Sequence, residues 1–447
     1  MFAIPDNFIR KTQSMCSELG VKVDAYLVEE NGKIIMRKSC PEHGQEELVV
    51  SRHPWYYKEL TEYYFKVMPN KMKQRRFYIY LSNICNLNCP VCLLEPNQNK
   101  ITDIRLDDFK QIIEKNKDCR FYLYGAEPTL RPDLKQWIEL LRYYGNLVNV
   151  HTNAIKLADY DYACKLKSWG VDYVSMQFDG FDDRVYEILR GKKLLDLKLK
   201  ALENLKRLDI ATGFNVTIAK DINEDQIHLI LDYALANNFV KDVSFATLSF
   251  LGDAKGNFSS EATLMPDELI DIVECQTKGK IKRENIFLFQ KLYYTLLAVF
   301  KVRRCYNFQH LVLYRKDNSA YMTLDQLFDL KRLEPVFSRY VKLVKKSRLL
   351  ASVYFLGSFF LNFFGKNFLK RLRCIPPGIL IPWKIRNIKI PSKTLFISFG
   401  TVCDNYKFDS HINDYCGQGF CFAGKDKIKM TDSVPDFTMS SKKEVCK

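Results

Sequence analysis

Three cysteines in one short segment are the residues of this chain best suited to chemistry. Cys85, Cys89 and Cys92 follow the apolar, aromatic run FYIYL with the spacing C-x3-C-x2-C. An iron–sulfur cube usually takes four cysteine thiolates, one for each iron. Three thiolates leave one iron without a protein ligand, so a small molecule can bind there. The segment therefore predicts a [4Fe–4S] cluster with one open corner.

Two other uses of clustered cysteines fit this segment less well. A structural zinc site takes four N or S ligands, most often from two C-x2-C pairs, whereas this segment offers three thiols. A disulfide framework is typical of short secreted chains. This chain has 447 residues, and its first residues, MFAIPDNFIRKTQ, contain no uninterrupted apolar region. Its 14 cysteines therefore indicate a reducing cytoplasm and iron–sulfur chemistry.

The cysteine spacing resembles that of radical SAM enzymes. In that family the open iron binds the amino and carboxylate groups of S-adenosylmethionine (SAM), and an electron from the cluster releases a 5′-deoxyadenosyl radical. The next apolar run ends in Gly125, Ala126, Glu127, Pro128 and Thr129, which resembles the family's GGEP segment along the methionine end of SAM. Glycine permits close approach of the backbone to a ligand, and we expect Glu127 to accept a hydrogen bond from the SAM ammonium.

Short apolar runs at 147–154, 171–180 and 211–223 alternate with helical patterns. This alternation predicts a parallel sheet with helical crossovers, and such sheets bind ligands at the carboxyl ends of their strands. The polar residues expected there are candidates for contacts with SAM or substrate: His151, Thr152, Asn153, Ser175, Gln177 and Asp179. Each of them alone is better explained as a loop or capping residue.

Further cysteines lie toward both ends of the chain. Asn31-Gly32 predicts a β-hairpin, with Cys16 before it and Cys40 and His43 after it, so a small metal site is expected there if a fourth ligand joins. The later cysteines predict an auxiliary iron–sulfur cluster, the alternative being that they bind nothing: Cys305, Cys403, Cys416 and Cys421.

The net charge of +16 favours an anionic partner. Basic residues concentrate around 331–373, and among them lies the apolar stretch LLASVYFLGSFFLNFF, 349–364. Its 16 residues fall short of the about 20 that span a bilayer. We interpret it as an interfacial, lipid-facing hairpin, the alternative being a buried core helix. No nucleic-acid-binding module is evident.

Most of residues 10–425 also resemble a narrower group, the archaeal tetraether lipid synthases and relatives labelled pterin methyltransferases. The matching stretches include EENGKIIMRKSCPEHG, ICNLNCPVC, SMQFDGFDDRVYEILRG, ATLSFLGDAKG and DNYKFDSHINDYC. The resemblance implies a hydrophobic substrate channel, extra iron centres, and hydrogen abstraction from an isoprenoid chain followed by carbon–carbon coupling. One departure is that Cys16 is followed by Ser17, Glu18 and Leu19 where the group has C-x2-C. The group's final cysteine also has no clear counterpart here.

Together these features predict an α/β fold: a partial (β/α)6 radical SAM barrel with an N-terminal β-hairpin segment and a C-terminal cysteine-containing extension. The expected segments are 1–74 (hairpin), 75–300 (core barrel), 301–345 (covering segment), 346–390 (membrane- or lipid-facing) and 391–447 (C-terminal). The expected partners are a lipid or other apolar anionic substrate, the inner face of the cell membrane, and a reduced ferredoxin- or flavodoxin-like electron donor. Three alternatives remain: a pterin methylase, a peptide maturase, and a non-catalytic iron–sulfur redox or sensor protein.

Overall fold

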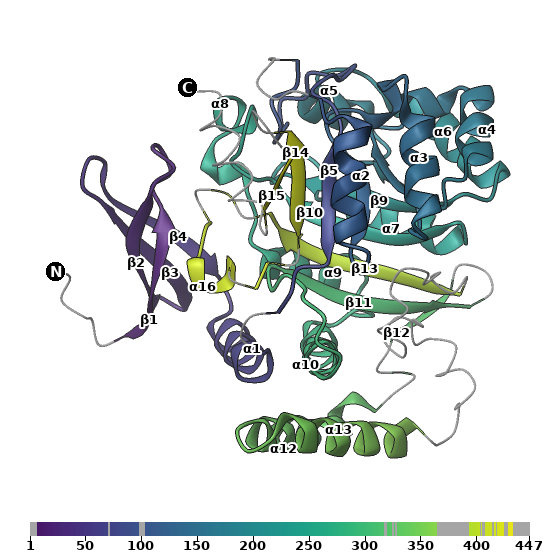
Figure 1. Cartoon of the computed structure of the whole chain (residues 1–447). Helices are drawn as coiled ribbons and strands as arrows, with labels where there is room; N and C mark the ends of the chain where they lie inside the picture. Colours follow the sequence, from purple (N-terminus) through teal and green to yellow (C-terminus); the bar gives the residue numbers. More distant parts are fainter. Residues whose placement is uncertain are drawn as a thin grey trace. The chain divides into compact units, whose positions relative to one another are not determined.

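The computed structural model describes residues 7–69, 72–97, 103–316, 320–323, 326, 329–363, 393–402, 404, 407–413, 415–416, 418–423 and 428–431. The chain forms two compact units, whose elements are labelled in Figure 1. The first unit comprises Met1–Met72, Met265–Gly400 and Asp409–Tyr415, and the second comprises Lys73–Leu264, Thr401–Phe408 and Cys416–Lys447. Each unit is therefore built from segments that are distant in the sequence.

The second unit is built around six parallel strands that neighbour one another in chain order. They are β5 (Arg76–Tyr80), β6 (Arg120–Tyr124), β7 (Asn149–Thr152), β8 (Tyr173–Gln177), β9 (Ala211–Ile218) and β10 (Val240–Thr247). The connecting helices are α2 (Leu106–Lys115), α3 (Leu134–Tyr143), α4 (Tyr160–Trp169), α5 (Asp183–Arg190), α6 (Leu195–Arg207) and α7 (Gln226–Ala236). This confirms the predicted α/β repeat of six strands. The described strands do not close into a barrel.

The last segments of the chain extend this sheet. Strand β14 (Gly419–Ala423) pairs in parallel with β5, and β15 (Ile428–Thr431) pairs antiparallel with β14. The short helices α8 (Ala254–Asn257), η1 (Pro128–Leu130), η2 (Ile155–Ala158) and η3 (Ser260–Ala262) lie in the connections. The core contains large, fully buried aromatic side chains such as Trp137, Phe109 and Phe121.

Capping residues fix where α5 begins and ends. The Asp182 side chain accepts a hydrogen bond from the backbone N–H of Arg184 at 2.8 Å, as an N-cap does. The helix ends at Gly191, which takes a left-handed φ of 76°. These two signals leave Arg190 in the last turn of α5, where its side chain is buried.

The first unit begins with an antiparallel sheet of four strands. They are β1 (Phe8–Met15), β2 (Lys22–Glu30), β3 (Lys33–Cys40) and β4 (Gly44–Ser51), in that spatial order. Asn31 and Gly32 join β2 to β3 with φ values of 49° and 68°. Positive φ at both central residues is the signature of a type I′ turn, so the predicted hairpin is confirmed.

The remaining elements of the first unit are mainly helical. They are α1 (Pro54–Val67), α9 (Pro266–Gln276), α10 (Arg283–Val299), β11 (Phe308–Arg315), β12 (Tyr321–Thr323), η4 (Leu330–Leu333), α12 (Glu334–Val344), α13 (Arg348–Phe363), β13 (Thr394–Thr401) and α16 (Ser410–Asn413). Strand β11 pairs antiparallel with both β12 and β13.

The apolar stretch 349–364 does not form the expected hairpin. Its described part lies in the single helix α13. Gly357 falls in the middle of this helix and does not interrupt it, and a Cβ atom added to it would meet nothing within 4 Å. One face of α13 is buried through Ala351, Phe355 and Phe359. Among the helices that the structure describes, none has the length and apolar content to cross a membrane. Residues 364–390 of the expected lipid-facing segment lie outside the described residues.

Candidate functional site

The cysteine loop, residues 81–97, follows the carboxyl end of β5 and carries the three half-buried cysteines. Asn97 closes this loop. Its side chain accepts a hydrogen bond from the backbone N–H of Cys85 at 3.0 Å and donates one to the Cys85 carbonyl at 3.1 Å. Its own N–H donates to the carbonyl of Asn83 at 2.8 Å. Asn97 adopts a φ of 64°, a conformation in which asparagine is enriched.

Hydrogen-bond donors point at the sulfur atoms of this loop. The backbone N–H of Leu87 lies 3.4 Å from Cys85 Sγ, and the Asn153 amide nitrogen lies 3.9 Å from the same atom. Arg190 donates to Cys89. Hydrogen bonds to sulfur are one of the means by which proteins set the reduction potential of an iron–sulfur cluster. The donors are therefore placed as a cluster would require.

The burial of the thiols also fits iron ligation. Burial raises the pKa of Cys85 to about 11 and that of Cys92 to about 12. Coordination to a cation deprotonates a thiol outright, so bound iron would stabilise thiolates that the protein alone disfavours. Among the described residues, these sulfurs do not form a group within 4.8 Å of one another.

The segment after β10 holds the cysteine loop from the side. The backbone N–H of Asp253 donates to the Cys92 carbonyl at 2.9 Å. Gly252 has a φ of 57°, and a Cβ atom there would lie 2.3 Å from the same carbonyl oxygen. Only glycine fits this approach without a shift of one backbone or the other. Gly252 belongs to the stretch LGDAKG, which resembles the tetraether lipid synthase group, but the sequence did not reveal its contact with the Cys92 carbonyl.

The turn after β6 contains Glu127, whose carboxylate bonds to other residues of the chain. The Glu127 carboxylate is fully buried and accepts hydrogen bonds from Thr129 N and Oγ1 at 3.1 and 2.5 Å, Thr152 Oγ1 at 2.6 Å and Asn153 N at 2.7 Å. These bonds join the ends of β6 and β7. Three of these donors bond to Oε1, whereas Oε2 accepts only the N–H of Asn153, so the expected contact with the SAM ammonium stays a prediction.

Gly125 and its neighbours pack against the start of the cysteine loop. Gly125 has a φ of 132°, and a Cβ there would lie 2.9 Å from the backbone nitrogen of Leu81. The N–H of Ala126 donates to the Ser82 carbonyl at 2.9 Å, and that of Glu127 to the Ile84 carbonyl at 3.1 Å. Pro128 and Thr129 then form η1. The close approach made by Gly125 is thus to the chain itself.

The structure separates the predicted strand-end residues into two groups. Asn153 lies beside the cysteine loop, with its side-chain amide 2.7 Å from Asn86 Oδ1. In contrast, Ser175 lies inside β8 and donates to Asn149 at 3.1 Å. His151 lies inside β7 among the rings of Tyr78 and Tyr124, where burial lowers its pKa to about 3. The placement of Ser175 at a strand end was wrong because β8 extends to Gln177, whereas His151 is the last residue but one of β7.

A buried charge network joins β8 to the cysteine loop, and it contains the predicted residues Asn153, Gln177 and Asp179 together with Arg190 and Lys198, which the sequence analysis missed. Asp179 is fully buried and pairs with Arg190 through bonds of 2.7 and 2.9 Å. Lys198 is also fully buried, and donates to Asn153 O and Gln177 Oε1, both at 2.5 Å. Gln177 in turn donates to Asp179. Burial lowers the pKa of Lys198 to about 7. Helical periodicity places Arg190 and Lys198 on the buried faces of α5 and α6, whereas their charge alone would have assigned them to solvent.

The cysteines proposed for an auxiliary cluster do not all belong to one unit. Cys305 belongs to the first unit, whereas Cys416 and Cys421 belong to the second and are buried. Cys421 lies within β14, where burial raises its pKa. Cys403 lies outside the described residues. The auxiliary cluster therefore stays a prediction.

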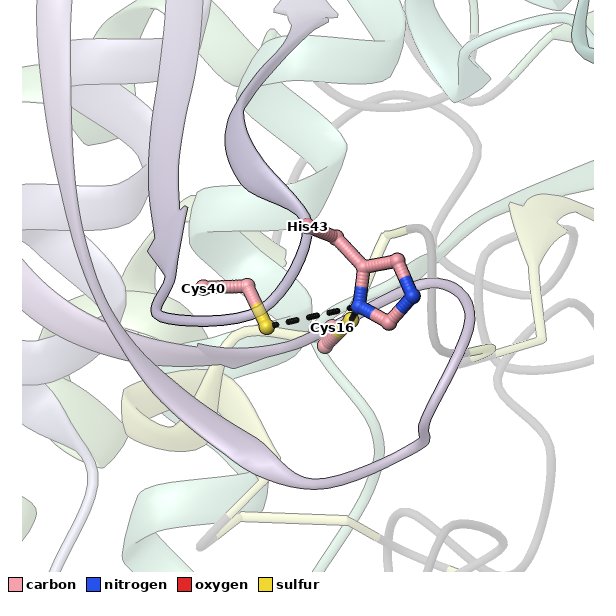
Figure 2. Close-up of side chains that lie close together, drawn as sticks. All are labelled: Cys16, Cys40 and His43. Atoms are coloured by element: carbon pink, nitrogen blue, oxygen red, sulfur yellow. Dashed lines mark hydrogen bonds between the residues drawn. The ribbon is translucent and has the colours of Figure 1, made fainter.

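A second group of metal-binding side chains lies in the first unit. Figure 2 shows the sulfurs of Cys16 and Cys40 directed at the ring of His43. They lie 3.6 and 3.7 Å from its Nδ1 atom, and the three donor atoms all lie within 4.8 Å of one another. Hydrogen bonding from His43 lowers the pKa of Cys40 to about 7. Both cysteines are buried, whereas His43 is exposed.

Two family models match the chain. One, described as the radical SAM superfamily, matches residues 79–234, and the other, described as an HMPTM N-terminal zinc ribbon domain, matches residues 8–52. The first match begins just before the cysteine loop and ends within α7. The second covers the sheet that carries Cys16, Cys40 and His43.

Similar proteins match parts of the chain. A 7,8-dihydro-6-hydroxymethylpterin dimethyltransferase of Methanocaldococcus jannaschii is 32% identical over 307 residues, which are 62% of this chain and 61% of that protein. A probable GTP 3′,8-cyclase of Pyrococcus abyssi is 28% identical over 159 residues, 35% of this chain and 51% of that protein. The chain thus spans between half and two thirds of the length of these curated relatives.

Among solved structures, Streptococcus suis SuiB bound to precursor peptide SuiA matches with a TM-score of 0.41 and 14% identity, over 61% of this chain and 71% of that one. The family model, by contrast, matches the same strands, helices and cysteine loop that the geometry singles out. Residues 79–234 therefore match the radical SAM superfamily in sequence, over the same strands and cysteine loop that the geometry singles out.

Proposed function

We propose that this protein is an enzyme that cleaves SAM reductively and uses the resulting radical to abstract hydrogen from its substrate. The observation that carries this proposal is the cysteine loop at the carboxyl end of β5, with three half-buried thiols and donors aimed at their sulfurs. A [4Fe–4S] cluster bound there supplies the electron that splits SAM into methionine and a 5′-deoxyadenosyl radical. The chain's own residues bind, orient and shield the reactants.

The residues around the cysteine loop are assigned to iron ligation, SAM binding and positioning. Cys85, Cys89 and Cys92 are the proposed iron ligands. The turn formed by residues 125–129 and the strand-end residues Asn153 and Gln177 are the proposed SAM contacts. The fully buried Asp179 and its partner Arg190 act as positioning residues, since Arg190 reaches Cys89 from a fixed ion pair. Both residues keep charge next to the ligands without exposure to water.

For the substrate we propose a lipid-like molecule, with carbon–carbon coupling of its isoprenoid chains as the outcome. Helix α13 supports this because its apolar residues lie on both faces. Leu349, Val353 and Leu361 are 77%, 62% and 78% exposed, and they recur with a spacing near the helical repeat, so they form one apolar stripe. Exposed Lys345 and Lys346 precede the helix. Such a stripe beside basic residues suits an anionic membrane surface.

This arrangement implies a peripheral location at the inner face of the cell membrane and a reduced ferredoxin- or flavodoxin-like electron donor. The net charge of +16 favours both the anionic surface and an acidic donor protein. Methylation of a pterin is the second candidate function. It is favoured by the name of the Methanocaldococcus jannaschii relative, which is a pterin dimethyltransferase.

The two candidate functions differ in their products. The reconstituted, reduced chain would be incubated anaerobically with SAM and either an isoprenoid phospholipid or the pterin. Lipid coupling predicts 5′-deoxyadenosine that increases with lipid, and a lipid two hydrogens lighter for each bond formed. Pterin methylation predicts S-adenosylhomocysteine together with 5′-deoxyadenosine, only when pterin is present. Deoxyadenosine that responds to neither compound would remove both substrates.

A further inference from the structure

Two loops of the N-terminal sheet repeat one five-residue pattern. Cys16-Ser17-Glu18-Leu19-Gly20 lies between β1 and β2, and Cys40-Pro41-Glu42-His43-Gly44 joins β3 to β4. Each loop begins with a buried cysteine and ends with a glycine of positive φ, 65° at Gly20 and 75° at Gly44. In the first loop the N–H of Leu19 donates to Cys16 Sγ at 3.5 Å. In the second, backbone N–H groups of Glu42 and His43 donate to Cys40.

The three donor atoms have the spacing that a tetrahedral ion needs. With Zn–S near 2.3 Å and Zn–N near 2.0–2.1 Å, the tetrahedral angle separates sulfur from nitrogen by about 3.5 Å. The observed separations are 3.6 Å for Cys16 Sγ to His43 Nδ1 and 3.7 Å for Cys40 Sγ to the same atom. The single lone pair of Nδ1 accepts one hydrogen bond, so two thiols converging on it are better explained by an ion between the three atoms.

The fourth corner of this site is open. Position 19 matches His43 in the repeated pattern, but it holds a leucine, which is 46% exposed. The group of donor atoms within 4.8 Å contains three members among the described residues. A nearby carboxylate, that of Glu46, is held by Ser17 Oγ at 2.5 Å and by Lys38 Nζ at 3.1 Å. The described residues thus supply three donors, and both His43 and Leu19, at the matching position of the other loop, are exposed.

We propose that this ribbon binds one ion of the zinc class through Cys16, Cys40 and His43, and that its fourth ligand is exchangeable and comes from outside the chain. The ligand class is a small monodentate donor, such as water, an imidazole or a thiolate. Closed four-donor zinc sites are structural, whereas three protein donors with an open position accept external ligands. The inference goes beyond the proposed function, because it concerns a unit that does not carry the cysteine loop.

The test uses cobalt(II) as a probe in the full chain. The background variant carries Cys85→Ser, Cys89→Ser and Cys92→Ser, so that neither an iron–sulfur chromophore nor those thiols interfere. We expect one cobalt per chain, with visible d–d bands that shift when imidazole is added. A Leu19→Cys change on this background completes the donor set. Its bands should not respond to imidazole, and its affinity for cobalt should be at least tenfold higher.

Two controls make the result specific. Leu19→Ser alters the same exposed position without adding a strong donor, so it should keep the imidazole response. His43→Gln, at another exposed position, should lower cobalt affinity at least tenfold, while circular dichroism verifies that the sheet is folded. The proposal is overturned if the background variant binds cobalt in bands that imidazole does not move, or if His43→Gln leaves the spectrum and affinity unchanged.

Discussion

Replacing Gly252 with alanine tests whether the segment after β10 holds the cysteine loop in place. Two effects add at this position. A left-handed φ of 57° costs a residue with a side chain about 1–2 kcal/mol. The new Cβ would also lie 2.3 Å from the Cys92 carbonyl oxygen, which is backbone and must move. Overpacking of this kind costs about 1–3 kcal/mol, so Gly252→Ala should lower the free energy of unfolding by about 2–5 kcal/mol.

Two other glycines separate these effects. Gly279 has a φ of 70° and open space around its Cβ position, so Gly279→Ala carries the conformational cost without the collision. Gly256 lies in α8, has open space and does not adopt a positive φ. Gly256→Ala should therefore be neutral or stabilising by about 0.5–1 kcal/mol.

The assay combines urea denaturation of the iron-free chain with iron content after anaerobic reconstitution. Gly252→Ala should lose both stability and bound iron, because the shift falls on the backbone of a proposed ligand. Gly279→Ala should lose about 1–2 kcal/mol and keep its iron. If Gly252→Ala matches Gly279→Ala in stability and binds the same amount of iron as the unchanged chain, the close approach does not support the cysteine loop.

Three further predictions concern other parts of the molecule. Glu127→Gln should lower the free energy of unfolding by about 1–3 kcal/mol, since the buried carboxylate accepts four hydrogen bonds. The exposed Glu139→Gln should change the free energy of unfolding by less than about 0.5 kcal/mol. Equal effects of the two changes would contradict the role of Glu127 in joining β6 to β7. His151 has a pKa lowered to about 3, so the folded state resists a proton that the unfolded chain takes up near pH 6.5. The free energy of unfolding should thus fall as pH falls from 6.5 toward 3, with a slope of up to about 1.4 kcal/mol per pH unit. His151→Gln should remove this pH dependence, and the exposed His228→Gln should not. If the stability of both variants depends on pH as in the unchanged chain, the assignment to His151 is wrong. Leu361→Lys should weaken sedimentation with anionic phospholipid vesicles severalfold while SAM cleavage without lipid stays unchanged; undiminished vesicle binding would argue against the α13 stripe.

Local signals in the sequence predicted much of this structure correctly. The C-x3-C-x2-C spacing, the strand–helix alternation and Asn31-Gly32 are each set by residues within a few positions of one another. Local patterns of this kind can be recognised without knowing the tertiary contacts. They led to the parallel strands β5–β10, the hairpin and the cysteine loop.

Contacts between distant residues account for what the sequence did not reveal. Gly252 meets the carbonyl of Cys92 only in the folded unit, and Lys198 reaches Asn153 across 45 positions. Lys198 shares the buried face of α6 with Ala201, Leu202 and Leu205, but its charge on that face is explained only by these distant partners. The same limit applies to Glu127, whose hydrogen bonds to Thr129, Thr152 and Asn153 the sequence did not reveal. Tertiary partners, rather than residue type, decide these roles.

The most direct test of the central claim is reductive cleavage of SAM by the reconstituted chain. The unchanged protein, Cys85→Ala and Cys119→Ala would be reduced anaerobically with dithionite and assayed for 5′-deoxyadenosine by mass spectrometry. Cys119 is a buried cysteine outside the cysteine loop and serves as the matched control. The account predicts deoxyadenosine from the unchanged protein and from Cys119→Ala, and none from Cys85→Ala. Formation of deoxyadenosine by Cys85→Ala at the rate of the unchanged protein would contradict it.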